Sequence, residues 1–182
     1  MAPPPANSTT GEIHGEEKSE SSDIPELEQD IHEQARELVK DKIIRLNDEE
    51  MEELVAGLLR AMGYKTRVSP KGWDRGRDIV ASPDGLGFES PRIVVEVKHR
   101  KGKIATDGIR SLSGALHHAD KGLFVSTGGF TKDARYEADR ANPPITTLEI
   151  DELVEMLTEY YESTDAITKS LIPLRAIYWP LD

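Results

Sequence analysis

Apolar and charged residues alternate over residues 92–100, and this pattern predicts a β-strand at the centre of the chain. Because successive side chains of a strand point to opposite faces, Val94, Glu96 and Lys98 are expected to share one face. The aliphatic residues before and between them form the other face. Burying a carboxylate and an ammonium group is costly unless they pair with each other or with a metal ion. Two explanations follow: an ion pair that faces water on an edge strand, or a functional site.

Two helices are predicted ahead of this strand from apolar residues at helical spacing. The first covers residues 24–46 and is amphipathic, so it is expected to dock on the domain or on a second subunit. Its apolar positions are Leu27, Ile31, Ala35, Leu38 and Val39. The second begins at Asn47 or Asp48, either of which can cap a helix, and ends before Gly63. Glu52 lies beside the apolar stripe of this second helix.

The remaining elements complete an α/β pattern. Strands are predicted over residues 64–69, 78–81, 121–126 and 145–150, and helices over residues 107–119, 131–141 and 151–161. The order from residue 47 onward is helix, three strands, helix, strand, helix, strand, helix, which predicts a mixed central sheet flanked by helices on both faces. If the strand at 78–81 pairs antiparallel with the central strand, Asp78 approaches Glu96.

The two ends of the chain differ from this predicted domain, which covers residues 47–162. Residues 1–23 are rich in Pro, Ser, Thr and Glu and bury too little apolar surface to order themselves, so a disordered tail is expected. Residues 163–182 include a strongly apolar stretch, which is expected to pack on the domain or on a partner.

The composition excludes several classes of protein. The chain has 182 residues, enough for one domain with a core, and no cysteine, so disulfides and thiolate metal sites are excluded. No apolar run approaches the roughly 18 residues of a membrane span and no signal peptide is recognisable, so we predict a cytoplasmic protein without membrane contact. The net charge of -11 weakens broad electrostatic binding to nucleic acid. A local basic run is formed by Lys98, His99, Arg100, Lys101 and Lys103.

Other catalytic and cofactor motifs are absent from the sequence. Gly85-Leu-Gly87 lacks the third glycine of a dinucleotide-binding fingerprint, and no phosphate-binding loop occurs. His117 and His118 are adjacent on a predicted helix, so they point about 100° apart and cannot both ligate one metal ion from ideal helix geometry. No serine lies in a Gly-x-Ser-x-Gly motif. A zinc enzyme or a serine hydrolase is therefore not expected.

Asp78, followed on the next strand by Glu96 and Lys98, resembles the Asp…Glu-x-Lys signature of the PD-(D/E)xK nuclease superfamily. A wider match, over about residues 46–157, is similar to the catalytic domain of Mrr-type restriction endonucleases. It consists of Met51-Glu-Glu-Leu-Val-Ala56, Met62-Gly-Tyr64, Asp74-Arg-Gly-Arg-Asp78, Val95-Glu-Val-Lys98 and residues 120–134. The resemblance implies a restriction-endonuclease-like core. Many family members have glutamine where this chain has Glu96, so the site here is more acidic.

The resemblance also implies a catalytic site. Asp78 and Glu96, with the main-chain carbonyl of Val97, offer the hard oxygen ligands that Mg²⁺ prefers. Lys98 is expected to orient the attacking water and to stabilise developing negative charge. Glu52 reaches the same site in the family's pattern as an outer ligand, although a solvated glutamate is equally consistent with its position.

The expected function is Mg²⁺-dependent hydrolysis of DNA, in the restriction of foreign or modified DNA, by a homodimer. Arg100, Lys101 and Lys103 are expected to contact DNA phosphates beside the scissile bond. The family's usual winged-helix recognition domain has no counterpart in the first 45 residues, so a separate recognition subunit stays open. Two alternatives are a structure-selective nuclease similar to Holliday-junction resolvases and a nuclease-derived binding module without activity. The acidic pair argues against the second, because clustered carboxylates without a metal ion lack compensation.

Overall fold

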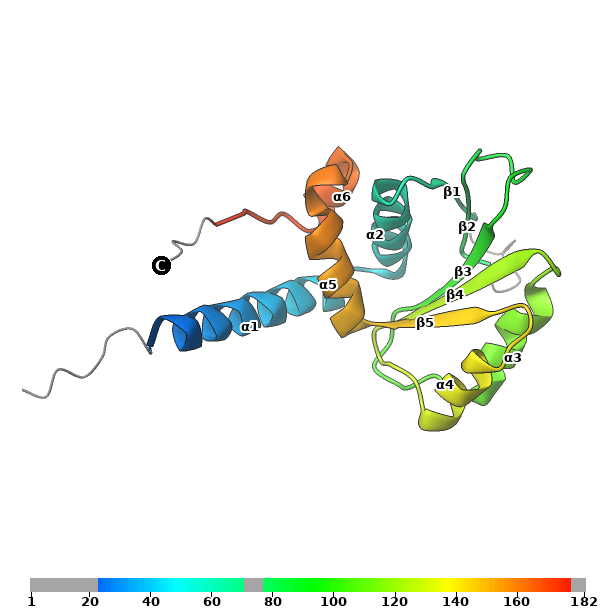
Figure 1. Ribbon diagram of the computed structural model, residues 1–182, viewed down its shortest axis with the longest axis horizontal. Coiled ribbons are helices and arrows are strands. Elements are labelled where there is room, and N and C mark those ends of the chain that lie inside the picture. Colours follow the sequence, from blue (N-terminus) through cyan, green and yellow to red (C-terminus); the bar gives the residue numbers. More distant parts are fainter. Residues whose placement is uncertain (1–22, 71–76, 178–182) are drawn as a thin grey trace, which may run out of the picture. The chain divides into compact units, whose positions relative to one another are not determined.

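The computed structural model describes residues 23–70 and 77–177 of the chain, and its centre is a five-stranded sheet (Figure 1). The strands are β1 (Lys65–Val68), β2 (Ile79–Ser82), β3 (Arg92–Lys98), β4 (Asp120–Ser126) and β5 (Ile145–Glu149), in this order across the sheet. The pairs β1–β2 and β2–β3 are antiparallel, whereas β3–β4 and β4–β5 are parallel. The sheet is therefore mixed, as predicted.

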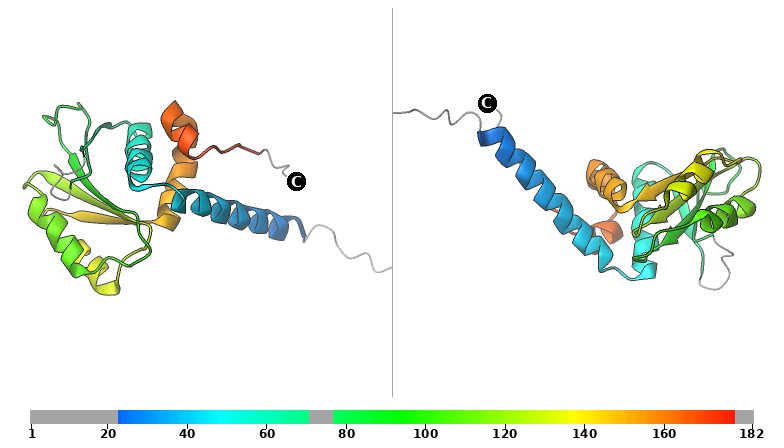
Figure 2. Two further views of the ribbon diagram at one scale, coloured as in Figure 1. Left: turned by 180° about the vertical axis from the view of Figure 1, so that it is seen from behind. Right: turned by 90° about the horizontal axis from the view of Figure 1, so that it is seen from below.

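Helices cover both faces of this sheet (Figure 1, Figure 2). On one face lie α2 (Asp48–Ala61) and α5 (Ile150–Tyr160), and on the other lie α3 (Thr106–Ala115) and α4 (Lys132–Asp139). The helix α1 (Asp23–Ile44) comes before them, and a 3₁₀ turn, η2 (Tyr161–Ser163), and α6 (Ala166–Leu171) follow. From α2 to α5 the order of helices and strands is the predicted one. None of the helices in the described residues is both long and apolar enough to cross a membrane.

The helix α2 begins and ends where its sequence predicts. The Asn47 side chain accepts a hydrogen bond from the Glu50 amide at 2.9 Å, and the Glu50 carboxylate accepts one from the Asn47 amide at 2.8 Å. These reciprocal bonds form a capping box. After the helix, Gly63 adopts φ +97°, a left-handed conformation that favours glycine. The helix that carries Glu52 is thus fixed at both ends.

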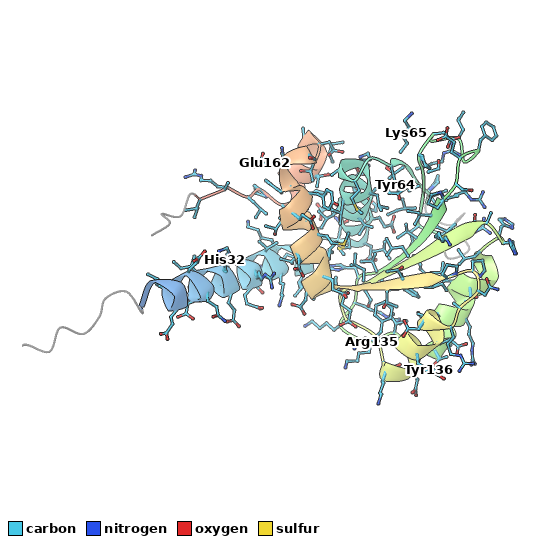
Figure 3. All side chains as sticks on the ribbon, viewed as in Figure 1. His32, Tyr64, Lys65, Arg135, Tyr136 and Glu162 are labelled. Atoms are coloured by element: carbon cyan, nitrogen blue, oxygen red, sulfur yellow. The ribbon has the colours of Figure 1, made fainter. Side chains whose placement is uncertain are left out.

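Two apolar cores, one on each face of the sheet, hold the layers together. In the first core, side chains of α2, α5 and the end of α1 pack against β2, β3, β4 and β5. In the second, side chains of α3 and α4 pack against Val94 and Phe124 of the sheet, and the rings of Phe124 and Phe130 meet edge to face at 5.5 Å. Figure 3 shows the side chains that fill the space on either side of the sheet. Burying each large apolar side chain of this kind contributes about 1.5–3 kcal/mol.

The strand β3 is the central strand of the sheet and is covered on both faces. Val95 and Val97 belong to the first core and Val94 to the second. Glu96 is buried on the face of the second core, whereas Lys98, at the end of the strand, is partly exposed. An ion pair that faces water on an edge strand is the wrong explanation, because β2 and β4 flank this strand and helices cover both sides.

The chain divides into two units after residue 34, a point that lies within α1. In the second unit, Val39 and Ile43 of α1 are buried in the first core, and Lys40 pairs with Asp151 of α5. In the first unit, Leu27 is exposed. The C-terminal part of α1 thus packs on the domain through both apolar contacts and an ion pair.

The segment after α5 also packs on the domain. Ile172 is fully buried, and the Tyr161 hydroxyl donates to its carbonyl at 2.9 Å while accepting from the Leu174 amide at 2.8 Å. Asp165 caps α6 and pairs with Arg60 of α2 at 2.6 Å. Residues 1–22 of the expected disordered tail lie outside the described residues, whereas its last residue, Asp23, begins α1. The last five residues of the C-terminal stretch also lie outside the described residues.

The helix α3 is shorter than predicted, because it ends at Ala115 rather than at residue 119. Leu116 already has an extended conformation, and the buried Asp120 carboxylate accepts a hydrogen bond from the His117 amide at 2.8 Å. This side-chain bond turns the chain from the helix into β4. Apolar periodicity does not register such a bond, so the sequence pattern places the helix end too late.

The same carboxylate joins the first residues of β3 and β4. Arg92 donates to Asp120 through Nε at 2.7 Å and through Nη2 at 2.8 Å. Burial by itself raises the pKa of Asp120, but the Arg92 guanidinium and the His117 amide outweigh burial and hold this pKa below its ordinary value. A lowered pKa means that the pair stabilises the fold above the ordinary carboxylate range and loses this effect as the pH falls.

Asp120→Asn is therefore expected to lower the free energy of unfolding at pH 7 by about 1.5–3 kcal/mol, the usual range for hydrogen bonds to charged groups. The difference from the wild-type chain should shrink as the pH falls through the folded-state pKa of Asp120. Denaturant unfolding over a pH series measures it. The exposed Asp139→Asn is the matched control, with an expected change within about 0.5 kcal/mol. A difference that stays constant with pH would contradict the assignment.

Candidate active site

Two acidic residues meet on neighbouring strands at the centre of the sheet. Ile79 pairs with Val95 in the antiparallel register of β2 and β3, so Asp78, one residue before β2, lies across from Glu96. The Asp78 carboxylate accepts a hydrogen bond from the Val97 amide at 2.6 Å. Both acids are buried, with 6% of Asp78 and 5% of Glu96 exposed. The predicted approach of Asp78 to Glu96 is confirmed by this strand pairing.

Lys98 completes the group from the same strand. Its Nζ lies 3.1 Å from Glu96 Oε1, and 38% of its side chain is exposed, so it links the buried acid to solvent. The second oxygen of the acid, Glu96 Oε2, is buried and has no hydrogen-bond partner within the described part of the chain. An unpaired buried carboxylate oxygen is costly, so Oε2 is suited to bind a positively charged ligand.

The charge state of Glu96 supports the same conclusion. Burial raises the pKa of this carboxyl group, Lys98 opposes the rise through its hydrogen bond and its charge, and the negative charge of Asp78 adds to it. The net result is a raised pKa. Without a cation, the carboxyl group therefore holds its proton more readily than an ordinary glutamate. A cation at Oε2 would reverse this effect.

The available donors fit a hard divalent cation. Asp78 and Glu96 supply carboxylate oxygens, and the chain has no cysteine that could supply a thiolate. Val97, between the two charged residues of β3, fixes the strand through its buried side chain and uses its amide to hold Asp78. Its main-chain carbonyl remains the predicted third oxygen.

Glu52 is not drawn into one three-acid group with these residues. It lies half-buried on α2. Over residues 23–70 and 77–177, no three His, Asp or Glu side chains gather in a way that could hold one metal ion. The acids that the structure brings together are thus Asp78 and Glu96, and a role for Glu52 as an outer ligand stays a prediction.

The predicted DNA-contacting residues follow the acidic pair on an exposed loop. Arg100, Lys101 and Lys103 are exposed between β3 and α3. The loop is fixed from behind, because the Ile104 amide donates to the Gly129 carbonyl at 2.9 Å. A Cβ atom at Gly128 would lie 2.5 Å from the carbonyl oxygen of Arg100, so only glycine permits this close approach. The basic loop is therefore presented on a rigid support.

The segment before Asp78 is only partly described. Residues 71–76, which include most of the Asp74–Asp78 motif, lie outside the described residues. Arg77 is described, and its Nη2 donates to the Ala115 carbonyl at the end of α3 at 2.6 Å. A cation at a helix C-terminus is favourable, so this bond anchors the chain next to Asp78.

Sequence reasoning missed one further residue beside the site. His99 Nε2 lies 2.8 Å from the Leu46 carbonyl, and its Nδ1 lies 3.2 Å from Thr127 Oγ1. These partners are 53 and 28 residues away along the chain. Local periodicity carries no signal for contacts of that range, so His99 was placed only in a basic run.

An apolar hollow of about 310 Å³ lies elsewhere, between α2, α5 and the sheet. Its lining includes Ile93 and Leu123, in the first halves of β3 and β4, and Tyr64, which follows α2 (Figure 3). It contains none of the predicted site residues. The acidic site is thus separate from this hollow.

The mixed sheet, with an acid before one strand and an acid and a lysine on the next, is a restriction-endonuclease-like core. Residues 43–157 match the sequence profile of the restriction endonuclease family, and the chain belongs to this family. It is 31% identical over 132 residues to the type IV methyl-directed restriction enzyme EcoKMrr of Escherichia coli (strain K12). That match covers 66% of this chain and 42% of the relative, so the chain spans less than half of the relative's length.

A solved structure shares the fold. The DNA modification-dependent restriction endonuclease AspBHI matches with a TM-score of 0.56 and 16% identity, over 75% of this chain and 38% of that one. The restriction endonuclease MspJI, in complex with a 27-mer oligonucleotide, matches with a TM-score of 0.46 and 15% identity, over 92% of this chain and 39% of that one. The resemblance to Mrr-type catalytic domains is thus confirmed at the level of family and fold.

Proposed function

We propose that this chain is a Mg²⁺-dependent DNA endonuclease that acts in the restriction of foreign or modified DNA. The observation that carries the proposal is the unpaired, buried Oε2 of Glu96, beside Asp78 and Lys98 on the central strands. A binding module without activity has no use for this arrangement, because the buried acidic pair lowers stability unless a cation compensates it.

The acidic residues would hold the metal ion. Asp78 and Glu96 provide carboxylate ligands, the Val97 carbonyl a neutral one, and Glu52 an outer ligand from α2. When bound, Mg²⁺ supplies Lewis-acid activation of water and neutralises charge on the phosphate. Glu96 must release its proton to bind the ion, so its raised pKa makes binding stronger as the pH rises.

Lys98 would act on the water and the phosphate. Its ammonium group is anchored on Glu96 Oε1 and is partly exposed, so it can face a substrate from a fixed point. In this position it orients the attacking water through a hydrogen bond and stabilises negative charge that develops on the phosphoryl oxygens. Because the Lys98 ammonium lies 3.1 Å from Glu96 Oε1, its positive charge is close to the proposed metal ligands.

Modified DNA is the proposed substrate, acted on by a homodimer. Support comes from the relatives, since one is named a methyl-directed restriction enzyme and another a modification-dependent restriction endonuclease. The described part of each chain contains one such acidic pair, so cutting both strands of a duplex at one place calls for two copies. A separate subunit that recognises the target is the alternative source of specificity.

One comparison tests the proposal and its nearest rival. Methylated plasmid, unmethylated plasmid and a four-way junction are incubated side by side with the protein and Mg²⁺, with Ca²⁺ and EDTA as controls. Preferential nicking or cutting of methylated plasmid is the expected result. Cleavage of the junction alone would favour a structure-selective nuclease. No Mg²⁺-dependent cleavage of any of the three would favour a binding module without activity.

The exposed basic loop is the proposed path of the DNA backbone. Replacing Arg100, Lys101 and Lys103 with serine is expected to weaken DNA binding at every sequence and to reduce the slope of log affinity against log salt by about 0.9 per lost phosphate contact. Binding isotherms over a salt series, with Ca²⁺ in a Lys98→Ala background to prevent cutting, measure the slope.

The matched control for this triple variant carries the same change of charge elsewhere. Lys42, Lys121 and Arg175 are exposed and lie outside the loop, so their replacement by serine should leave the slope unchanged. Equal slopes for the loop variant and the wild-type chain would remove the loop from the DNA path. Equal losses in both triple variants would indicate an effect of net charge alone.

A further inference from the structure

His99 joins three separate segments of the chain at the edge of the acidic site. It directly follows Lys98, its Nε2 lies 2.8 Å from the Leu46 carbonyl ahead of α2, and its Nδ1 lies 3.2 Å from Thr127 Oγ1 after β4. The ring is half-buried. Both ring nitrogens are therefore engaged, which distinguishes this residue from a histidine on an open surface.

The hydrogen-bond roles follow from the chemistry of the partners. A carbonyl oxygen only accepts, so Nε2 carries a hydrogen and donates to Leu46. The Thr127 hydroxyl has one hydrogen, which it can donate either to Nδ1 or to the Arg100 carbonyl at 3.3 Å. The neutral ring is thus satisfied on both sides when Thr127 donates to it. The ring acts as a fixed bridge of two hydrogen bonds.

Two of the three bridged segments lead to residues of the predicted site. Leu46 precedes Asn47, which caps α2, the helix of Glu52. The Thr127 amide donates a hydrogen bond to the Lys98 carbonyl at 3.2 Å, so a second hydrogen bond joins the segment after β4 to the end of β3. One imidazole ring therefore connects the start of α2, the last residue of β3 and the chain after β4.

We propose that His99 is a positioning residue for the nuclease reaction, holding Lys98 and the start of α2 at fixed places around the acidic pair; this rests on the proposed function. The Lys98 ammonium is anchored on Glu96 of the same strand, so its location depends on where the backbone at the end of β3 places both side chains. A displacement of about 1 Å in a reacting constellation can lower the rate by about 100-fold. The alternative is a histidine that only stabilises the fold.

Four variants separate positioning from stability. His99→Ala removes both bonds, whereas His99→Gln keeps a donor that can reach the Leu46 carbonyl. Thr127→Val removes the bond to Nδ1 with little change of shape. His118→Ala, at an exposed histidine outside the site, is the control. For each protein, kcat and KM for DNA are measured with Mg²⁺, and thermal unfolding confirms that the protein is folded at the assay temperature.

A second readout reports on the site without requiring activity. The Val97 amide is bonded to Asp78 and the Thr127 amide to the Lys98 carbonyl, so hydrogen exchange at these two amides measures how firmly the end of β3 is held. In His99→Ala both amides should exchange faster than in the wild-type chain, and His99→Gln should restore slow exchange.

In His99→Ala, kcat is expected to fall about 10–100-fold while KM stays within about threefold of the wild-type value. His99→Gln should recover part of the lost kcat, and Thr127→Val should have an intermediate kcat. His118→Ala should leave kcat unchanged. An unchanged kcat in folded His99→Ala would overturn the proposal and leave the nuclease function standing. Lost activity with unchanged exchange at both amides would also overturn it. If the wild-type chain cleaves no DNA, the proposed function fails, and the exchange rates alone then decide whether His99 holds the end of β3.

Discussion

Asp78→Asn is expected to abolish Mg²⁺-dependent cleavage of DNA while the chain stays folded. Asparagine keeps a side-chain oxygen that can accept the hydrogen bond from the Val97 amide, but it removes the charge that the metal ion requires. Loss of charge stabilisation at the reacting phosphate of this kind lowers the rate by about 10³-fold or more. Single-turnover cleavage, with thermal unfolding of both proteins, measures the two effects separately.

Metal binding gives this variant a second, independent test. A ligand that binds only the folded state stabilises it by about 2.7 kcal/mol at 100 times its dissociation constant, so Mg²⁺ should raise the unfolding temperature of the wild-type chain and not of Asp78→Asn. Asp84→Asn is the matched control, because the Asp84 carboxylate accepts amide bonds in the loop after β2, at the other end of that strand. Wild-type chain that shows neither a Mg²⁺ effect nor cleavage would refute the metal-dependent mechanism.

Lys98→Met is expected to produce the second large effect, a loss of turnover of about 10²–10³-fold, the usual range for a positioned proton-transfer or charge-stabilising group. Methionine keeps an apolar stem of similar length but lacks the ammonium group. DNA binding in Ca²⁺ should change little, because Arg100, Lys101 and Lys103 remain. Cleavage and binding assays on the same preparation distinguish loss of chemistry from loss of affinity.

The pH dependence of metal binding should also change in this variant. Lys98 lowers the pKa of Glu96 against the larger effect of burial, so its removal raises this pKa further. Because Glu96 binds metal only when ionised, Mg²⁺-induced stabilisation should begin at a higher pH in Lys98→Met than in the wild-type chain. Without metal, the raised pKa of Glu96 stabilises the folded state at low pH, and this contribution should be lost as the pH rises through that pKa. Lys98→Arg keeps the charge and should leave this pH unchanged while still impairing cleavage. An identical pH dependence in all three proteins would contradict the coupling of Lys98 to Glu96.

Much of the fold could be predicted from the sequence because its signals are local. Apolar spacing located α2 and the order of the strands, and the Asn47 cap and Gly63 marked the ends of α2. The acidic pair was also predictable, because Asp78 directly precedes β2 and Glu96 lies on β3, and these two strands form one hairpin. A hairpin contact depends only on short-range register, which alternation of side chains specifies.

Other features depend on contacts that no local pattern records. Alternation within β3 predicts a charged face, but it cannot show that Glu96 is buried while Lys98 stays partly exposed, because burial depends on contacts with distant elements. The helix α6 was expected only as an apolar segment, since its cap, Asp165, is held by Arg60 from α2, 105 residues earlier. The hydrogen bonds of His99 also join residues that are far apart in the sequence, so no local pattern predicts them.

The unpaired Glu96 oxygen affects two properties of the protein in opposite directions, its stability without metal and its proposed affinity for the ion. A buried carboxylate without a partner weakens the resting protein, whereas glutamine at this position, as in many family members, would remove that charge and leave one oxygen donor. Under the proposed function, glutamate at residue 96 lowers the stability of the metal-free protein and strengthens binding of the ion. The proposal therefore predicts that the folded chain opens and is degraded more readily where divalent cations are scarce, so that its abundance follows the supply of Mg²⁺.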